Sequence, residues 1–305
     1  MRTMISKMGQ AVRGVAREVC SVVPGSRIPT VSELEERCGA SRGNVQKALS
    51  FLKESGAVTL EAHGQSGTIL TSIDYLALAG SCGVTSIIGS MPLPYTSRYE
   101  GLATALFTLI GSRDLRSYIT FQRGSGPRVQ MLLEGMTDYC VMSRLAYEDI
   151  VSRGAPIVEA LALGPLSYVG RHVLIARDPG RTDWRGARVG IDESSVDQCM
   201  LTRNFFSQTE VEYVPVQYIH IVEAIESGEL DAGIWNEDDV HLRASGLTFR
   251  PINNTGEAVE KNTRASLVVR KDDALTGHLL SSLVDPASVL DVQSKVMSGQ
   301  LPARY

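Results

Sequence analysis

The sequence predicts a winged helix-turn-helix domain (α+β) over residues 1–73, followed by a two-lobed α/β domain over residues 74–305. Two observations predict this order. In the stretch ASRGNVQKALSFLKESGAVTL, a polar start leads into a helical apolar repeat, then a glycine and a β-like run. Beyond residue 74, short apolar runs alternate with helical patterns, as is typical of α/β domains.

The distribution of charge fits this division. Residues 1–73 contain nine Lys and Arg against six Asp and Glu, whereas the remainder contains 21 against 28. A basic front segment beside an acidic remainder indicates a nucleic-acid contact in the front domain.

Composition excludes several other classes of protein. The chain is 43% hydrophobic and 21% charged, which is ordinary for a globular protein. No apolar run approaches the roughly 20 residues of a membrane span, and the first residues lack the apolar core of a secretory signal. The five cysteines form no CxxC pair, and no His/Cys cluster has metal-ligand spacing. We therefore expect a cytoplasmic protein without membrane contact, metal or cofactor.

The first two helices of the front domain are predicted from apolar spacing and capping signals. A helical repeat precedes Pro24-Gly25; its members are Met8, Val12, Val15, Val19 and Val22. In the stretch IPTVSELEERCG, Thr30 and Glu33 have the spacing of a capping box, and Gly39 suits the left-handed residue that ends a helix.

A third helix follows, with Ser41 as its expected cap. Its inward face is predicted from the spacing of Val45, Ala48, Leu49 and Leu52. Two short helices joined around a glycine have the layout of a helix-turn-helix, whose second helix enters the major groove with its N-terminal part. The predicted DNA-binding residues of this helix are Ser41, Arg42, Asn44, Gln46 and Lys47.

The stretches AVTLE and TILTS flank HGQSG and predict a hairpin that forms the wing. Its tip would present His63, Gln65 and Ser66. Residues 8–70 resemble the DNA-binding domain of GntR-type transcriptional regulators through PGSRIPTVSELEERCGASRGNVQKALSFLKESGAV and HGQSGT. The resemblance implies that Arg42 meets the DNA backbone or a base, and that the wing approaches the minor groove. Ser32 and Gln46 stand where many members of that family carry arginine.

The second domain is predicted to contain two lobes of mostly parallel sheet. Lobe one is expected over about residues 74–170 and 265–305, and lobe two over about 171–264. The stretches IVEALAL and YVGRHVLIARD read as long strands that pass between the lobes, and helices are expected near 274–283 and 286–299.

Three stretches of this second domain resemble type II periplasmic-binding-protein domains. They are RGSGPRVQMLLEGMTDYCVMSRLA, ARVGIDESSVDQCMLTRNFF and YIHIVEAIESGELDAGIWNEDD. Together with the front domain, the whole chain resembles the YhfZ-type branch of GntR-like regulators. The resemblance implies a cytoplasmic effector sensor attached to a DNA-binding domain.

Polar residues follow several predicted strands, where ligands of open α/β sheets bind. The predicted ligand-binding residues are Ser90, Tyr95, Thr96, Arg123, Ser125, Ser143, Arg144, Asp192, Ser194, Ser195, Trp235 and Asn236. Arginines at strand ends predict a small anionic or zwitterionic ligand. Alternatives stay open: Ser125, Ser143 and Ser194 suit helix caps, and Trp235 suits either a cleft wall or the core. RGSGPR is not a P-loop, because no Gly-Lys-Ser/Thr follows it.

The leading hypothesis is a ligand-responsive transcription factor that binds a double-stranded operator as a homodimer. An enzyme of the same two-lobed fold, acting on a small anionic metabolite, is the alternative. Against it, the sequence shows no nucleophile elbow, no HExxH and no evident Ser/His/Asp set. His172 and His220 are interpreted as packed or surface histidines. A transport-binding protein is the second alternative, which the absence of a signal peptide disfavours.

Overall fold

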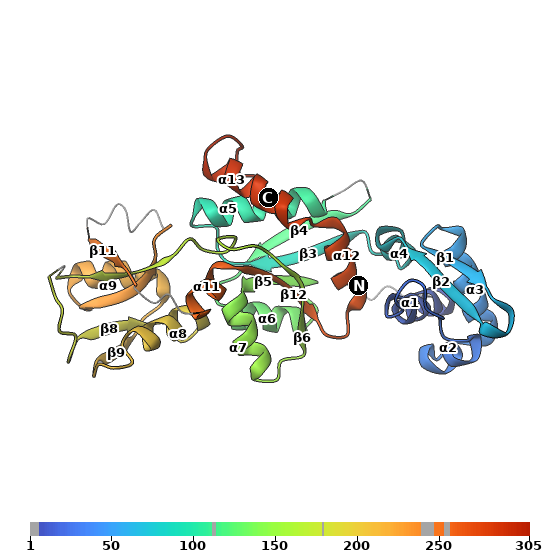
Figure 1. Ribbon diagram of the computed structural model, residues 1–305, viewed down its shortest axis with the longest axis horizontal. Helices are drawn as coiled ribbons and strands as arrows, with labels where there is room; N and C mark the ends of the chain where they lie inside the picture. Colours follow the sequence, from blue (N-terminus) through green and yellow to red (C-terminus); the bar gives the residue numbers. More distant parts are fainter. Residues whose placement is uncertain (1–5, 112–113, 179, 239–246, 253–256) are drawn as a thin grey trace. The chain divides into compact units, whose positions relative to one another are not determined.

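The computed structural model describes residues 6–111, 114–178, 180–238, 247–252 and 257–305 (Figure 1). Backbone proximity divides the chain into two compact units, which are described in turn. The first runs to Ile87 and also takes in Ile110–Ser117 and Lys271–Leu283; the second comprises Ile88–Leu109, Tyr118–Arg270 and Val284–Tyr305. Within the described ranges, no helix is both long enough and apolar enough to cross a bilayer.

The first unit contains the predicted helix-turn-helix and its wing. Its elements are α1 (Lys7–Cys20), α2 (Val31–Cys38), α3 (Arg42–Glu54), β1 (Val58–Ala62), η1 (Gly64–Ser66), β2 (Thr68–Ile73), α4 (Tyr75–Ser81) and α12 (Ala274–Leu283). Strands β1 and β2 pair antiparallel as the predicted hairpin. The helix-turn-helix fold that the sequence predicts is therefore confirmed.

Local signals begin and end these helices as predicted, with one exception. The Glu33 amide donates to Thr30 Oγ1 (3.3 Å), and the Thr30 amide donates to the Glu33 carboxylate (2.6 Å), which completes the capping box. Gly39 ends α2 with φ 61°, in the left-handed region that glycine adopts easily. Ser41 occupies the N-cap position of α3, but its hydroxyl makes no capping bond, so that expectation is wrong.

The core of the first unit is assembled from the predicted apolar faces. Leu34 of α2 and three residues of α3, Val45, Ala48 and Leu52, are completely buried. They pack in one cluster with apolar residues of α1 and of the hairpin. This packing fixes which side of α3 is left to solvent, because the buried residues occupy the opposite side of the helix.

Helix α12 belongs to the first unit although its residues, Ala274–Leu283, come about 200 positions after the hairpin in the sequence. Ala274 and Leu275 pack against the apolar core of the helix-turn-helix, and Leu78 of α4 is buried in the same core. Tyr75 stacks on His278 with ring centroids 4.8 Å apart and planes 15° apart. The compact unit therefore extends beyond residues 1–73, because helices that follow this range complete its core.

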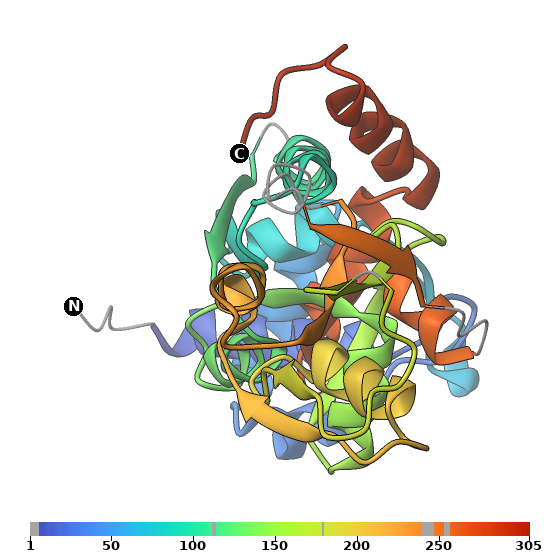
Figure 2. The same ribbon diagram turned by 90° about the vertical axis from the view of Figure 1, so that its left-hand side faces the viewer.

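The second unit contains two five-stranded sheets. The first sheet has the spatial order β4 (Arg116–Phe121), β3 (Ser86–Met91), β5 (Tyr139–Ser143), β12 (Ala265–Arg270), β6 (Ile157–Ala162). Helices α5 (Ser97–Ile110) and α13 (Pro286–Met297) cover one face, and α6 (Ser125–Leu133) and α7 (Arg144–Ser152) cover the other (Figures 1 and 2). The contact of α5 with α13 is close, since a Cβ on Gly101 would lie 2.9 Å from the Gln293 backbone.

The second sheet forms the other lobe. Its order is β11 (Thr248–Pro251), β7 (His172–Ala176), β10 (Ala232–Asn236), β8 (Arg188–Ile191), β9 (Glu212–Pro215). The segments that follow its strands include α8 (Val196–Phe205), η2 (Tyr218–His220), α9 (Ile221–Ser227) and α11 (Glu257–Thr263). Two apolar clusters pack against the sheet, one of them around Trp235 and the other around Trp184 and Phe206.

The expectation of mostly parallel sheets is wrong, because both sheets are mixed. Strands β3 and β5 are parallel, as are β8, β9 and β10. Strands β7 and β12 run antiparallel to each neighbour for which the structure describes a pairing. Each of these two strands follows a segment that arrives from the other lobe. Strands β7 and β12 each begin at the edge of their sheet where the parallel strands end. They therefore run antiparallel to those strands.

Candidate functional site

The first candidate site is the exposed side of α3. Ser41, Arg42, Gln46 and Lys47 are exposed, and Asn44 is half-buried. Because the opposite side of α3 is packed into the core, these side chains form the free N-terminal surface of the second helix of the motif. The structure therefore brings all five of the residues predicted for this helix onto one surface.

The wing supplies the other predicted residues. His63 and Gln65 are exposed, and His63 Nε2 lies 3.5 Å from a Glu61 carboxylate oxygen. Ser66 lies in η1, and its side chain is outside the described part of the structure. A Cβ on Gly67, whose φ is 86°, would lie 2.7 Å from Arg27 Nε. Arg27 is thus a further exposed cation packed on the wing, which the sequence interpretation missed although it lies only three residues before Thr30 of the capping box.

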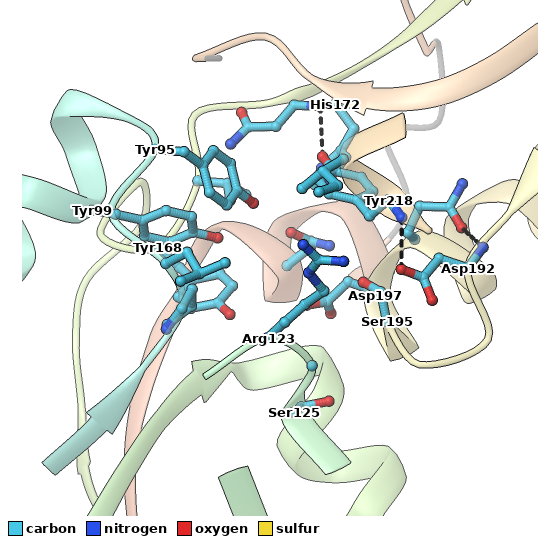
Figure 3. A pocket seen from close by; sticks show the side chains of 18 of the residues that line it. Tyr95, Tyr99, Arg123, Ser125, Tyr168, His172, Asp192, Ser195, Asp197 and Tyr218 are labelled. Carbon is cyan, nitrogen blue, oxygen red and sulfur yellow. Dashed lines mark hydrogen bonds between the residues drawn. The ribbon is translucent and has the colours of Figure 1, made fainter. Parts of the chain in front are cut away.

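The second candidate site is a cavity in the second unit, between the ends of strands from its two sheets. Its empty volume is about 670 Å³, open solvent included. Figure 3 shows Tyr95, Tyr99 and Tyr168 on one side and Tyr218 and Asp192 on the other, with Arg123 extending between them. This is the place that the topology of open α/β sheets favours for a ligand.

Half of the predicted ligand-binding residues line this cavity. They are Tyr95, Arg123, Ser125, Asp192, Ser195 and Asn236. The other six do not line it, and each has a structural role or a different environment. Ser90 is fully buried, with a hydroxyl that has no partner within the described residues. Thr96 Oγ1 accepts from the Tyr99 amide (3.2 Å), and the Ser194 hydroxyl donates to Asp192 (2.6 Å).

Ser143 and Arg144 are the clearest corrections. Ser143 caps α7 by accepting from the Ala146 amide at 2.9 Å. Arg144 points to a separate hollow, where it pairs with Glu148 (2.7 Å) and Glu159. These hydrogen bonds raise the pKa of the guanidinium. Arg144 is displaced from the cavity because it begins α7, and its neighbours on α7 and β6 supply the carboxylates.

Trp235 is a core residue rather than a wall of the cavity. Its side chain is 2% exposed and belongs to the apolar cluster of the second lobe. It stacks on Tyr218 with ring centroids 4.1 Å apart. Residues of a strand alternate between faces, so the position next to the cavity belongs to Asn236 instead.

Several residues that line the cavity were missed by the sequence interpretation. They are Tyr99, Arg128, Tyr168, His172, Asp197, Gln198, Tyr218 and Asn262, among others. Arg128 follows Ser125 at a spacing of three on α6, which is a signal that could have found it. Asn262 follows no predicted strand, so no pattern in the sequence indicated it.

The charged groups of the cavity differ in how they are held. Arg128 is 2% exposed and donates to the carbonyl oxygens of Val141 (3.1 Å) and Gln122 (2.8 Å). Burial raises the pKa of Asp197 to about 6, although the hydrogen bond from Ser143 and the charge of Arg128 act in the opposite direction. The cavity therefore contains a fixed buried cation and a carboxyl group whose proton affinity is increased.

Asp192 and His172 also line the cavity, but the first is already hydrogen-bonded to backbone amides and the second is uncharged. The Asp192 carboxylate accepts from the Ser194 amide (2.9 Å) and the Tyr218 amide (2.8 Å), so it shapes the loop after β8. Burial lowers the pKa of His172 to about 4, with the Asp238 charge opposing the shift. His172 is consequently neutral at pH 7, which agrees with its interpretation as a packed histidine.

Several polar contacts join the two lobes around this cavity. Arg123 donates to Gln217 Oε1 at 2.7 Å, and Ser143 donates to Asp197 Oδ1 at 2.5 Å. Arg98 of α5 pairs with Asp238 at 2.7 Å. The lobes are therefore held together by polar bonds on several sides of the cavity.

Comparison with known proteins places the chain in a family. Residues 74–305 match the family described as the YhfZ C-terminal domain, and residues 24–70 match a helix-turn-helix domain. The protein YhfZ of Escherichia coli K12 is 35% identical over 305 residues, which cover 100% of this chain and 99% of that protein. The chain belongs to the YhfZ family.

Solved structures agree with this assignment. The crystal structure of YhfZ from Shigella flexneri is 36% identical and covers 76% of this chain and 98% of that chain, with a TM-score of 0.65. The periplasmic aliphatic sulphonate binding protein SsuA of Escherichia coli is 13% identical, covering 70% of this chain and 75% of its own, with a TM-score of 0.52. The second domain of this YhfZ-family protein therefore has a periplasmic-binding-protein-like fold of type II.

A binding protein of a methionine transporter from Streptococcus pneumoniae shows the same fold likeness. It is 11% identical, covers 70% of this chain and 92% of that chain, and has a TM-score of 0.51. At such identity the likeness concerns the fold alone. The likeness therefore assigns no ligand to the cavity of this YhfZ-family protein.

Proposed function

We propose that the protein is a DNA-binding transcriptional regulator whose operator affinity is modulated by a small ligand in the cavity of its second domain. The observation that carries this proposal is the presence in one chain of a helix-turn-helix with a free cationic surface and a cavity lined by charged groups. A cationic helix surface binds phosphates and base edges, and a cavity with charged walls binds a polar small molecule.

The DNA-binding part of the proposal rests on α3 and the wing. Arg42 and Lys47 supply positive charge for phosphates, and Asn44 and Gln46 have the amide groups that read base edges. One such helix reads few base pairs, so we propose that two copies of the chain form a homodimer on paired half-sites. The protein would act in the cytoplasm, where the DNA is.

We propose a sensing rather than a catalytic role for the cavity. At neutral pH His172 is a poor general base, because its pKa is about 4. The Asp192 carboxylate is engaged by the amides of Ser194 and Tyr218. Neither His172 nor Asp192 therefore has the properties of a general base. Asp197 does accept from the Ser143 hydroxyl, but this serine caps α7 and does not line the cavity, which supports binding without turnover.

The DNA-binding surface is tested by removing single cations from α3. We expect Arg42→Ala and Lys47→Ala each to weaken binding to a duplex that the wild-type protein enriches from a random library. Each lost phosphate contact should reduce the slope of log K against log salt by about one unit. Fluorescence anisotropy at several salt concentrations measures both quantities. Lys53→Ala is the matched control, because Lys53 is exposed on the last turn of the same helix. Wild-type affinity and slope in both variants would disprove the assignment.

A route for coupling is present within the chain. Asn262 of the cavity lies just before β12, and β12 leads through Lys271 into α12. Helix α12 in turn packs on α1 and α4 of the helix-turn-helix unit, where His278 stacks on Tyr75. We propose that ligand-dependent shifts of β12 reach the DNA-binding domain through α12.

The coupling route is tested at the ring stack. We expect His278→Ala to leave the affinities for ligand and for duplex near those of the wild type, while the effect of ligand on duplex affinity decreases. A coupling free energy of about 1–3 kcal/mol is typical, and the ligand's effect on DNA must equal the DNA's effect on ligand. Anisotropy with and without ligand measures the first effect, and calorimetry with and without duplex measures the second. Undiminished coupling in this variant would exclude α12 as the route.

A further inference from the structure

The cavity contains charges of both signs that form no direct ion pairs with one another. Arg123 and Arg128 line it together with Asp192 and Asp197. Over the described ranges of the chain, no ion pair within 4.0 Å joins either arginine to either aspartate. Buried charges are costly unless they are paired, so a ligand with complementary charges would gain contacts that the protein alone does not make.

An anionic group fits best at the N-terminus of α6. Gly124 is the N-cap of this nine-residue helix and has no side chain that could accept a capping hydrogen bond. The first backbone N–H groups of α6 can therefore donate to a bound anion. Arg123 precedes the helix, and Arg128 lies on its second turn. Two guanidinium groups and a helix N-terminus at one end of the cavity form a site for a carboxylate.

A cationic group fits best beside Asp197. One oxygen of its carboxylate accepts from Ser143, and burial raises its pKa to about 6, so an adjacent cation would stabilise the charged carboxylate. Tyr95, Tyr99 and Tyr168 form a continuous aromatic wall, in edge-to-face contacts with centroids 5.5 and 5.3 Å apart. Carboxylates and tyrosine rings are the usual partners of an ammonium group.

The buried side-chain amide of Asn262 also indicates that the cavity binds a polar ligand. Its side chain is 1% exposed and lines the cavity. Neither its amide nitrogen nor its oxygen has a hydrogen-bond partner among the residues that the structure describes. Leaving both atoms unpaired costs free energy, so the ligand should carry a group that donates and accepts near this amide.

We propose that the cavity binds a small α-amino acid with a polar side chain, its carboxylate at the N-terminus of α6 beside Arg123 and Arg128, its ammonium beside Asp197, and a polar group on Asn262. This inference rests on the proposed effector role of the cavity and names the class of ligand. A zwitterion leaves the charge of the cavity balanced, whereas a simple anion would leave Asp197 without a cation.

The test is a ligand panel on the full-length protein. The twenty proteinogenic L-amino acids are compared by thermal shift and calorimetry with their 2-hydroxy acids, which lack the ammonium group, and their carboxamides, which lack the carboxylate. We expect at least one polar amino acid to bind, and both of its analogues to bind at least tenfold more weakly. Binding of no amino acid, or equal binding of the 2-hydroxy acids, would overturn the proposal.

Two substitutions assign the contacts. Asp197→Asn keeps an acceptor for Ser143 but removes the charge, so it should weaken the amino acid at least tenfold and not the 2-hydroxy acid. Asn262→Ala should weaken both. Glu193→Gln and Asn204→Ala are matched controls, because both residues are exposed near or on α8. Circular dichroism verifies folding of each variant. Equal losses of amino acid and hydroxy acid in Asp197→Asn would contradict the ammonium site.

The pH dependence provides a second readout of the same contact. Protonation of Asp197 removes the partner of the ammonium group, so affinity should be constant above about pH 7 and fall by up to tenfold per unit below about pH 6. Arg128 and Asp149 also act on Asp197, and His172 titrates lower, near pH 4. Asp197→Asn should lose this dependence. An unchanged profile in that variant would contradict the assignment.

The outcomes separate this inference from the proposed function. Amino-acid binding without any effect on duplex affinity would retain the ligand class and refute the regulatory role. An effect of the 2-hydroxy acids, and not of the amino acids, on duplex affinity would retain the regulatory role and refute the ligand class.

Discussion

Gly124→Ala should weaken ligand binding by at least tenfold. Gly124 has φ 78°, where an L-residue is strained by about 1–2 kcal/mol. A Cβ at this position would also lie 2.9 Å from the Ser194 carbonyl oxygen, which belongs to the other lobe. The loop must then shift at the N-terminus of α6, where the carboxylate of the ligand is expected. Calorimetry with the amino acid that binds best in the panel measures the loss.

The matched control is two residues further along α6. A Cβ on Gly126 meets nothing within 4 Å, so Gly126→Ala should bind ligand like the wild type. Arg144→Ala should do the same, because Arg144 pairs with Glu148 and Glu159 outside the cavity. Wild-type affinity in Gly124→Ala would show that the closed contact between this loop and Ser194 is not required for binding.

Loss of the Arg98–Asp238 pair is expected to have the largest effect on stability. The two side chains are 12% and 16% exposed and lie 2.7 Å apart, and Asp238 also accepts from the Gly170 amide at 2.7 Å. Arg98→Ala leaves a largely buried carboxylate without its cation, which typically costs about 3–5 kcal/mol. Urea denaturation followed by circular dichroism should show a correspondingly lower free energy of unfolding.

An exposed ion pair in the same domain serves as the comparison. Lys295 of α13 pairs with Asp291 at 2.6 Å, and the two side chains are 49% and 59% exposed. Lys295→Ala should therefore change stability by less than about 1 kcal/mol. In the double variant Arg98→Ala/Asp238→Ala, part of the loss should be recovered, because the unpaired charge is removed as well. Equal effects of Arg98→Ala and Lys295→Ala would show that burial of the Arg98–Asp238 pair does not increase its contribution to stability.

The helix-turn-helix could be predicted in detail because its signals are local. The capping box of Thr30 and Glu33, the left-handed Gly39 and the apolar period of α3 each act over a few residues. Such interactions form wherever the segment folds, so their spacing in the sequence is sufficient to place them. The cap expected from Ser41 was wrong. The Ser41 side chain is exposed, so its hydroxyl can hydrogen-bond to water instead of to the helix amides.

The cavity could be predicted only in outline. Strand ends indicated the correct region and half of the residues, including Arg123 and Asp192. Arg144 was assigned to it wrongly, because the sequence does not show that Glu148 and Glu159 compete for the guanidinium. Trp235 and Asn236 are neighbours on one strand, and only the packing of β10 decided which of them faces the cavity.

The sequence by itself determined the order of the elements, the exposed surface of the helix-turn-helix and the two-lobed class of the second domain. These depend on periodicity, caps and turns, which act between residues close in the chain. Only the tertiary structure decided that β7 and β12 run against their neighbours, that α12 completes the core around α1, and that Asn262 meets Arg128 and Asp197 in one cavity. Those facts depend on contacts between residues far apart in the chain, and no local pattern encodes such contacts.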